Sequence, residues 1–145
     1  MELIYFPFER VIEINHYILQ TEKGLKGRAD VAKLQGALAR VDNAIAYEGL
    51  DDVFEIASKY ACSIAVAHAL SDANKRTGLA VALEYLSLND YEITLDHVLI
   101  ADAMRDLVVG DLSESEFADI LYAQYFVSHN PMEWLWPQPT NSLTF

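Results

Sequence analysis

Residues 68–78 read HALSDANKRTG, and this stretch separates two segments whose apolar spacing is helical. Before it, residues 51–67 predict an amphipathic helix that ends at His68, and after it residues 75–88 predict an almost wholly apolar helix. The charged residues therefore lie at a helix-loop-helix corner. The first turn of the second helix has backbone N–H donors without intrahelical partners and carries the positive end of the helix dipole, so this corner predicts an anion site.

Two side chains of this corner suit the transfer of a phosphoryl or nucleotidyl group. Histidine ordinarily titrates near neutrality, so His68 can accept a proton from a substrate hydroxyl. Asp72 offers a hard oxygen ligand, and Mg²⁺ beside phosphates usually takes only one or two protein oxygens. Taken alone, His68 would more simply be a cap or a satisfied core group, and Asp72 a helix N-cap. Their short spacing, together with the residues that follow, favours the chemical interpretation.

The four residues after Asp72 can contact phosphates. Arg76 can hold two phosphate oxygens at once, Lys75 adds a second cation, and Asn74 adds a neutral amide. Ala73 is small, so the backbone can approach a ligand closely. A solvated helix end would explain the basic pair alone, but cations at the positive end of a helix dipole are unfavourable unless an anion lies nearby. The sequence therefore predicts a phosphate-binding run here.

At these residues the chain resembles the Fic/Doc family, whose motif runs His-x-Phe-x-acid-small-Asn-Gly/Lys-Arg. The matching residues are His68, Asp72, Ala73, Asn74, Lys75 and Arg76. The run DANKRT is similar to the Doc, or death-on-curing, branch of the family. Weaker similarity covers AYEGLDDVFEIASKYACSIAVAHAL before the motif and AVALEYLSLNDYEI after it. Leu70 departs from the family's usual Phe but keeps an apolar anchor.

The resemblance implies an all-α, Fic-like helical bundle in which a central apolar helix follows the loop. It also implies that His68 is the general base, that Asp72 binds Mg²⁺, and that the loop backbone with Asn74 and Arg76 holds the phosphates of ATP. Typical Fic enzymes transfer AMP and carry Gly where this chain has Lys75, whereas Doc-like members carry Lys. The resemblance therefore implies transfer of the γ-phosphate to a protein hydroxyl, a threonine of elongation factor Tu in the family, which blocks translation.

Two other functions stay open at this point. The first is a Fic-type AMP transferase of the same fold, and the second is a non-catalytic protein that uses the loop to bind a nucleotide or a partner. Some Fic proteins carry an inhibitory helix with a Ser/Thr-x-x-x-Glu-Gly/Asn signature. Its nearest counterpart here is Glu48-Gly49, but Ala44 occupies the Ser/Thr position. The resemblance thus implies restraint by a separate, Phd-type antitoxin whose C-terminal segment folds onto the toxin.

Composition indicates one compact cytoplasmic domain over residues 1–129, followed by a tail at 130–145. The chain has 145 residues, of which 52% are hydrophobic, and a single cysteine, Cys62, which predicts a small buried residue and excludes an internal disulfide. The net charge of −12 argues against nucleic acid as a ligand. We find no signal-peptide pattern and no run of membrane-spanning length.

Apolar spacing predicts helices nearly throughout residues 8–124. They begin near Phe8, Val31 and Val53 and after the loop, followed by a helix capped by Asp96 that runs to Val109, and a last one opened by a capping box of Ser113 and Glu116. Val53, Ile56, Tyr60, Ile64 and His68 share one predicted helix face. Residues 91–93 predict a short extended piece. The tail carries three prolines and both tryptophans, Trp134 and Trp136, and predicts packing on its own domain or partial disorder. His16, His97 and His129 lack ligand-like spacing and predict no zinc site.

Overall fold

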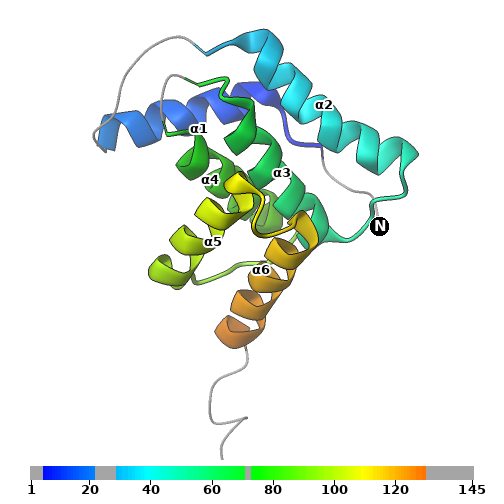
Figure 1. The fold of residues 1–145 in the computed structure, drawn as a ribbon, viewed down its shortest axis with the longest axis vertical. Helices are drawn as coiled ribbons and strands as arrows, with labels where there is room; N and C mark the ends of the chain where they lie inside the picture. The colour runs from blue at the N-terminus through cyan, green and yellow to red at the C-terminus, as the bar shows by residue number, and fades with distance from the viewer. Residues whose placement is uncertain (1–4, 22–28, 71–72, 130–145) are drawn as a thin grey trace, which may run out of the picture.

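The chain folds into helices that surround a central helix pair (Figure 1). The computed structural model describes residues 5–21, 29–70 and 73–129. Within these ranges it contains helices and no strand, and the helices are α1 (Phe8–Thr21), α2 (Val31–Tyr47), α3 (Val53–Ala67), α4 (Asn74–Leu88), α5 (His97–Val109) and α6 (Glu114–His129). The predicted all-α fold is confirmed. Residues 91–93, where a short extended piece was expected, lie in the connection from α4 to α5 and form no strand. None of the described helices is long and apolar enough to cross a membrane.

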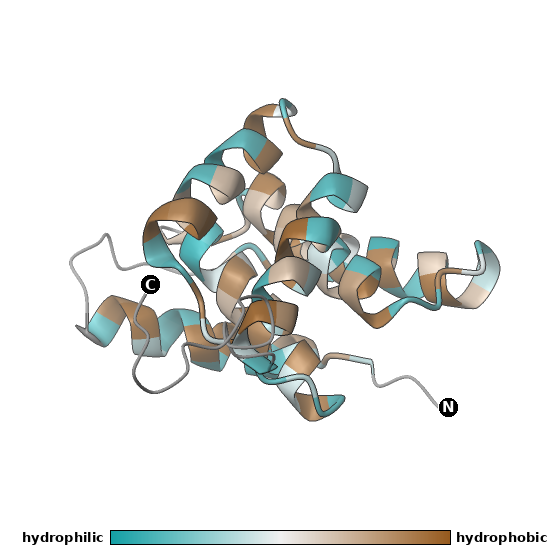
Figure 2. Ribbon diagram, turned by 90° about the horizontal axis from the view of Figure 1, so that it is seen from below, coloured by the Kyte–Doolittle hydropathy of each residue, from teal (hydrophilic) through white to brown (hydrophobic). Residues whose placement is uncertain are grey.

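Helices α3 and α4 form the centre of the molecule. Helix α3 packs against α2, α4, α5 and α6, while α4 packs against α3, α1 and α5. Tyr60 of α3 and Tyr85 of α4 are fully buried, and their rings lie 5.1 Å apart between centroids. On the outer helices, polar and apolar residues alternate along the ribbon, as expected for helices with one buried face (Figure 2). The apolar helix after the loop is central as predicted, and α3 before the loop is enclosed by more neighbours.

Aspartate and serine side chains start the helices where the sequence places them. Asp52 accepts hydrogen bonds from the backbone N–H groups of Phe54 and Glu55 at the start of α3, and Asp96 caps α5 in the same way. Before α6, the Glu116 N–H donates to Ser113 Oγ at 3.0 Å and the Ser113 N–H donates to Glu116 Oε1 at 2.9 Å. These bonds hold the pKa of Glu116 below its ordinary value. The predicted capping box is confirmed.

Helices α3 and α4 approach each other closely at Gly78. A Cβ atom at this position would lie 2.6 Å from the carbonyl oxygen of Ala61 and 3.4 Å from the backbone nitrogen of Ala65. Both contacts are with the backbone of α3, so a larger residue forces the helices apart. Gly78 lies one turn after the loop, and this close approach therefore fixes how the ends of α3 and α4 meet.

We expect Gly78→Ala to lower the free energy of unfolding by about 1–3 kcal/mol, the usual cost of overpacking a core. Gly36→Ala in α2 is the matched control, because a Cβ there has no neighbour within 4 Å. The control should gain about 0.5–1 kcal/mol, since Ala is the better helix former. Urea unfolding of both variants measures the difference. Equal stabilisation of the two proteins would show that α3 and α4 can separate without cost.

Candidate active site

The backbone turns sharply at His68. Helix α3 ends at Ala67, and His68 is its C-cap residue with φ 51° and ψ 37°, in the left-handed region. Tyr60 and Ile64 are buried as expected, but the prediction that His68 continues their helix face is wrong. The left-handed conformation of His68 directs the chain away from that face. The His68 side chain is therefore exposed and not packed in the core. The imidazole is therefore accessible to a substrate.

Three backbone connections hold the loop that follows. The Asn74 amide bridges back to Leu70: its Nδ2 donates to the Leu70 carbonyl oxygen at 3.1 Å, and its Oδ1 accepts from the Leu70 N–H at 3.2 Å. The carbonyl oxygen of Ala69 accepts from the Asp30 N–H at 2.6 Å, which ties the loop to the start of α2. Leu70 itself is buried, so the apolar anchor predicted at this position is confirmed.

The loop is flanked by two non-glycine residues in left-handed conformation. His68 stands at its start, and Ala73, with φ 62° and ψ 30°, stands at its end as the N-cap of α4. Such a conformation costs an L-residue about 1–2 kcal/mol, and it persists only where surrounding contacts impose it. The Asn74 bridge and the buried Ala69 and Leu70 provide those contacts. Backbone strain is thus concentrated at the predicted chemical site.

One cavity of about 300 Å³ lies at this corner, with walls from α3, the first turn of α4 and the end of α5. Its lining residues are Ala65, His68, Ala73, Asn74, Lys75, Arg76 and Val108. Every predicted site residue that the structure describes therefore lines the same cavity, while Asp72, the predicted Mg²⁺ ligand, lies outside the described residues. Ala65 could have been found from its position in the last turn of the predicted helix, directly before the corner. Val108 carries no signal in the sequence, because it reaches the site only through the packing of α5.

Two cationic side chains line the cavity although the chain carries a net charge of −12. Lys75 and Arg76 lie in the first turn of α4, both exposed, and that turn contains no acidic residue. Ala73 at the N-cap has no side-chain acceptor for the first N–H groups of the helix. The positive end of the helix dipole and two cations therefore converge on one small cavity beside His68, an arrangement that suits the phosphates of a nucleotide.

The sequence from α1 to α4, which includes this corner, matches a known family. Residues 5–86 match the model of the Fic/DOC family. The chain belongs to the Fic/DOC family. It is also similar to "Protein kinase doc" of Escherichia phage P1, with 32% identity over 117 residues that cover 81% of this chain and 92% of that protein. Val108 lies outside residues 5–86, so one wall of the cavity comes from a part of the chain beyond the match.

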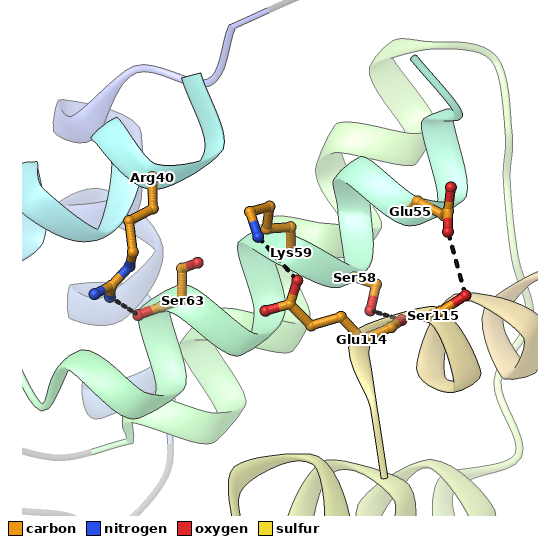
Figure 3. A network of polar contacts seen from close by, with 7 residues as sticks. All are labelled: Arg40, Glu55, Ser58, Lys59, Ser63, Glu114 and Ser115. Carbon is orange, nitrogen blue, oxygen red and sulfur yellow. Dashed lines mark hydrogen bonds and ion pairs between the residues drawn. The ribbon is translucent and has the colours of Figure 1, made fainter. Parts of the chain in front are cut away.

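Helix α3, which carries His68 at its end, is held by polar contacts with α2 and α6 (Figure 3). Lys59 Nζ contacts Glu114 Oε1 at 3.1 Å, and Ser58 Oγ donates to the Glu114 carbonyl oxygen at 2.6 Å. Arg40 of α2 donates to the carbonyl oxygen of Ser63 at 3.5 Å. These contacts fix α3 along its length, and they give the Fic/DOC site a firm support on that side.

Glu48, the nearest counterpart of an inhibitory glutamate, lies away from the cavity of this Fic/DOC chain. It is the C-cap residue of α2 and lines another cavity with Glu55 and Lys59, near the start of α3. Glu55 and His68 are thirteen positions apart, which corresponds to about 20 Å along a helix. Glu48 is therefore at the opposite end of α3 from Arg76.

The remaining candidates of the sequence analysis lie outside the cavity. Cys62 is half-buried, and burial together with the nearby Glu114 raises the pKa of its thiol to about 11, so it stays protonated near neutral pH. His16, His97 and His129 are exposed. The described part of the chain contains no group of three or more His, Cys, Asp or Glu side chains that could hold a metal ion.

Proposed function

We propose that this Fic/DOC protein transfers the γ-phosphate of Mg-ATP to a hydroxyl group of a target protein. The observation that carries the proposal is Lys75, which is exposed and lines the same cavity as His68. A lysine at this place occupies space that a glycine would leave open along the backbone, and it adds a positive charge. This favours binding of ATP with its terminal phosphate at the site. The similarity to a protein named as a kinase supports the same assignment.

In this reaction His68 accepts the proton of the target hydroxyl. The oxygen then bonds to the γ-phosphorus, the bond between that phosphorus and the β,γ-bridging oxygen breaks, and ADP leaves. Lys75, Arg76 and the first turn of α4 stabilise the charge on the transferred group, which is the main task of a protein in phosphoryl transfer. We propose Asp72 as the residue that would hold Mg²⁺, which when bound would neutralise part of the phosphate charge.

We further propose that the protein is a cytoplasmic toxin of a toxin–antitoxin module. The family resemblance suggests a threonine of elongation factor Tu as the target and a Phd-type protein as the antitoxin. The position of Glu48, far from Arg76 along α3, supports restraint by a separate protein. Recovery of large amounts of active protein from cells without an antitoxin, and without a growth defect, would contradict the toxin proposal.

The two possible transfers differ in which phosphorus reaches the target. We expect a host lysate treated with the protein and Mg-ATP to incorporate label from γ-labelled ATP and none from α-labelled ATP. Mass spectrometry of the labelled band then identifies the target and the modified residue. Label from the α position would establish a Fic-type AMP transferase instead. If neither label is transferred while ATP still binds, the protein is a nucleotide-binding member of the family without catalysis.

Lys75→Gly tests the residue on which this assignment depends. We expect the variant to lose roughly tenfold or more of its γ-phosphate transfer, because one charge that neutralises the transferred group is removed. The control is Lys33→Ala, which removes an exposed lysine outside the cavity. Alanine is used at this position because glycine would disturb α2. An unchanged rate for Lys75→Gly would contradict a role of this side chain in positioning ATP.

A further inference from the structure

Helices α1 and α4 share a buried polar contact directly beside the candidate active site. Asn15 Nδ2 donates a hydrogen bond to Thr77 Oγ1 at 3.1 Å. Asn15 is 4% exposed and Thr77 is fully buried, so this bond is shielded from water. Thr77 directly follows Arg76, which lines the same cavity as His68. A residue of α1 that lies outside this cavity is therefore connected to the helical turn that forms one of its walls.

Thr77 closes the first turn of α4. Its backbone N–H donates to the carbonyl oxygen of Ala73 at 2.8 Å, so the turn that carries Lys75 and Arg76 is one hydrogen-bonded unit. The next residue, Gly78, lies against the backbone of α3. The first turn of α4 is thus held by α3 at Gly78 and by α1 at the Thr77 hydroxyl. Close packing at Gly78 sets the distance between α3 and α4, whereas the hydrogen bond also sets a direction.

A second polar contact between α1 and α4 lies farther from the cavity. Arg10 donates two hydrogen bonds to the carboxylate of Glu84, from Nε and from Nη2, each 2.6 Å long. Glu84 is seven residues after Thr77, which corresponds to about 10 Å along α4. This ion pair keeps α1 packed on α4 when the bond at Asn15 is lost. Removal of the Asn15 bond should therefore act on the first turn of α4 and leave the two helices in contact.

We propose that Asn15 is a positioning residue, which acts through Thr77 on the cations that bind the phosphates of ATP. The inference rests on the proposed function, because that function assigns Lys75 and Arg76 to the phosphates. An apolar pair at the same place would fill the space, but it would favour no single direction, whereas a buried hydrogen bond does. Small displacements of a binding group weaken it strongly, since charge-assisted bonds to phosphate depend on distance and angle.

Two substitutions separate positioning from stability. Asn15→Leu and Thr77→Val each remove one partner and nearly keep the side-chain volume, and the double variant replaces the bond by an apolar contact. Each single variant should unfold at a lower urea concentration than the wild type, and the double variant should recover part of this loss, because both partners are then apolar. Circular dichroism follows unfolding, because both tryptophans, Trp134 and Trp136, belong to the tail at 130–145, which lies outside the described residues. In all three variants we expect the Kd of Mg-ATP, measured by calorimetric titration, to rise roughly tenfold.

Arg10→Met is the matched control. It removes the other polar contact between the two helices, so it should lower the urea midpoint as Asn15→Leu does but leave the Kd of Mg-ATP unchanged. A Kd that rises equally in Arg10→Met overturns the proposal, because the bond at Asn15 would then be only structural. A Kd that returns to the wild-type value in the double variant overturns it for the same reason, and so does an unchanged Kd in Asn15→Leu.

Hydrogen exchange without nucleotide distinguishes a failure of this inference from a failure of the proposed function. We expect the Thr77 amide to exchange roughly tenfold faster in Asn15→Leu, relative to the Val81 amide one turn later, because only the first turn of α4 is released. Faster exchange in a protein that does not bind Mg-ATP would contradict the proposed function and still support Asn15 as the residue that positions this turn. Unchanged exchange at Thr77 overturns the inference, whatever the affinity for ATP.

Discussion

Replacement of His68 is expected to reduce kcat/KM for protein phosphorylation by roughly 10²–10⁴, the usual contribution of a general base. The histidine side chain is exposed and lines the cavity with Lys75 and Arg76, so its loss removes a proton acceptor without opening the core. Binding of ATP should change little, because its phosphates are proposed to bind at the start of α4. Initial rates with γ-labelled ATP, together with calorimetric titration of ATP, separate the two effects.

The backbone at His68 decides which substitution is used. With φ 51° this position favours asparagine over alanine, because asparagine enters the left-handed region more readily. We therefore prefer His68→Asn, which keeps the turn but cannot accept a proton near neutral pH. His97→Ala at the start of α5 is the control, since His97 is exposed and eleven positions before Val108, about 16 Å along the helix. A rate for His68→Asn within about threefold of the wild type would exclude His68 as the base.

Local rules predict much of this fold from the sequence. The caps Asp52 and Asp96 and the capping box of Ser113 and Glu116 act over two or three residues, so their patterns are visible along the chain. The site residues from Ala73 to Arg76 were predicted for the same reason: they are consecutive, and the start of a helix necessarily gathers them on one loop.

Contacts between distant segments explain what the sequence does not show. Val108 enters the cavity because α5 packs on the central pair, and the bond from the Asp30 N–H to Ala69 depends on where α2 begins in space. The end of the helix at His68 was predicted, but the exposure of the His68 side chain was not. The apolar spacing continues to His68, while the buried Ala69 and Leu70 impose a left-handed conformation there. These features are set by tertiary packing, which no local periodicity encodes.

The amide of Asn74 has a role that its residue type alone did not reveal, because both of its polar atoms bond to the backbone of Leu70. We expect Asn74→Asp to lower kcat/KM by roughly 10²–10³, with much of the loss in the KM for ATP. The carboxylate can still accept from the Leu70 N–H, but it cannot donate to the Leu70 carbonyl oxygen. It also places a negative charge in the cavity where phosphates are proposed to bind.

Stability should respond differently from activity in this variant. A carboxylate in the first turn of α4 interacts favourably with the helix dipole by about 0.3–1 kcal/mol, which offsets part of the lost hydrogen bond. Asn74→Ala has no such compensation, because it removes both bonds, and we expect it to unfold more easily by about 1–3 kcal/mol. Asn43→Asp adds the same charge on an exposed position of α2 and should change neither property.

If Asn74→Asp and Asn74→Ala lose equal activity at equal salt, the repulsion of phosphate is negligible and the amide acts on the loop alone. If Asn74→Asp keeps the wild-type rate, the bridge to Leu70 does not position the phosphate site, because a broken bridge and an added charge would both have been tolerated.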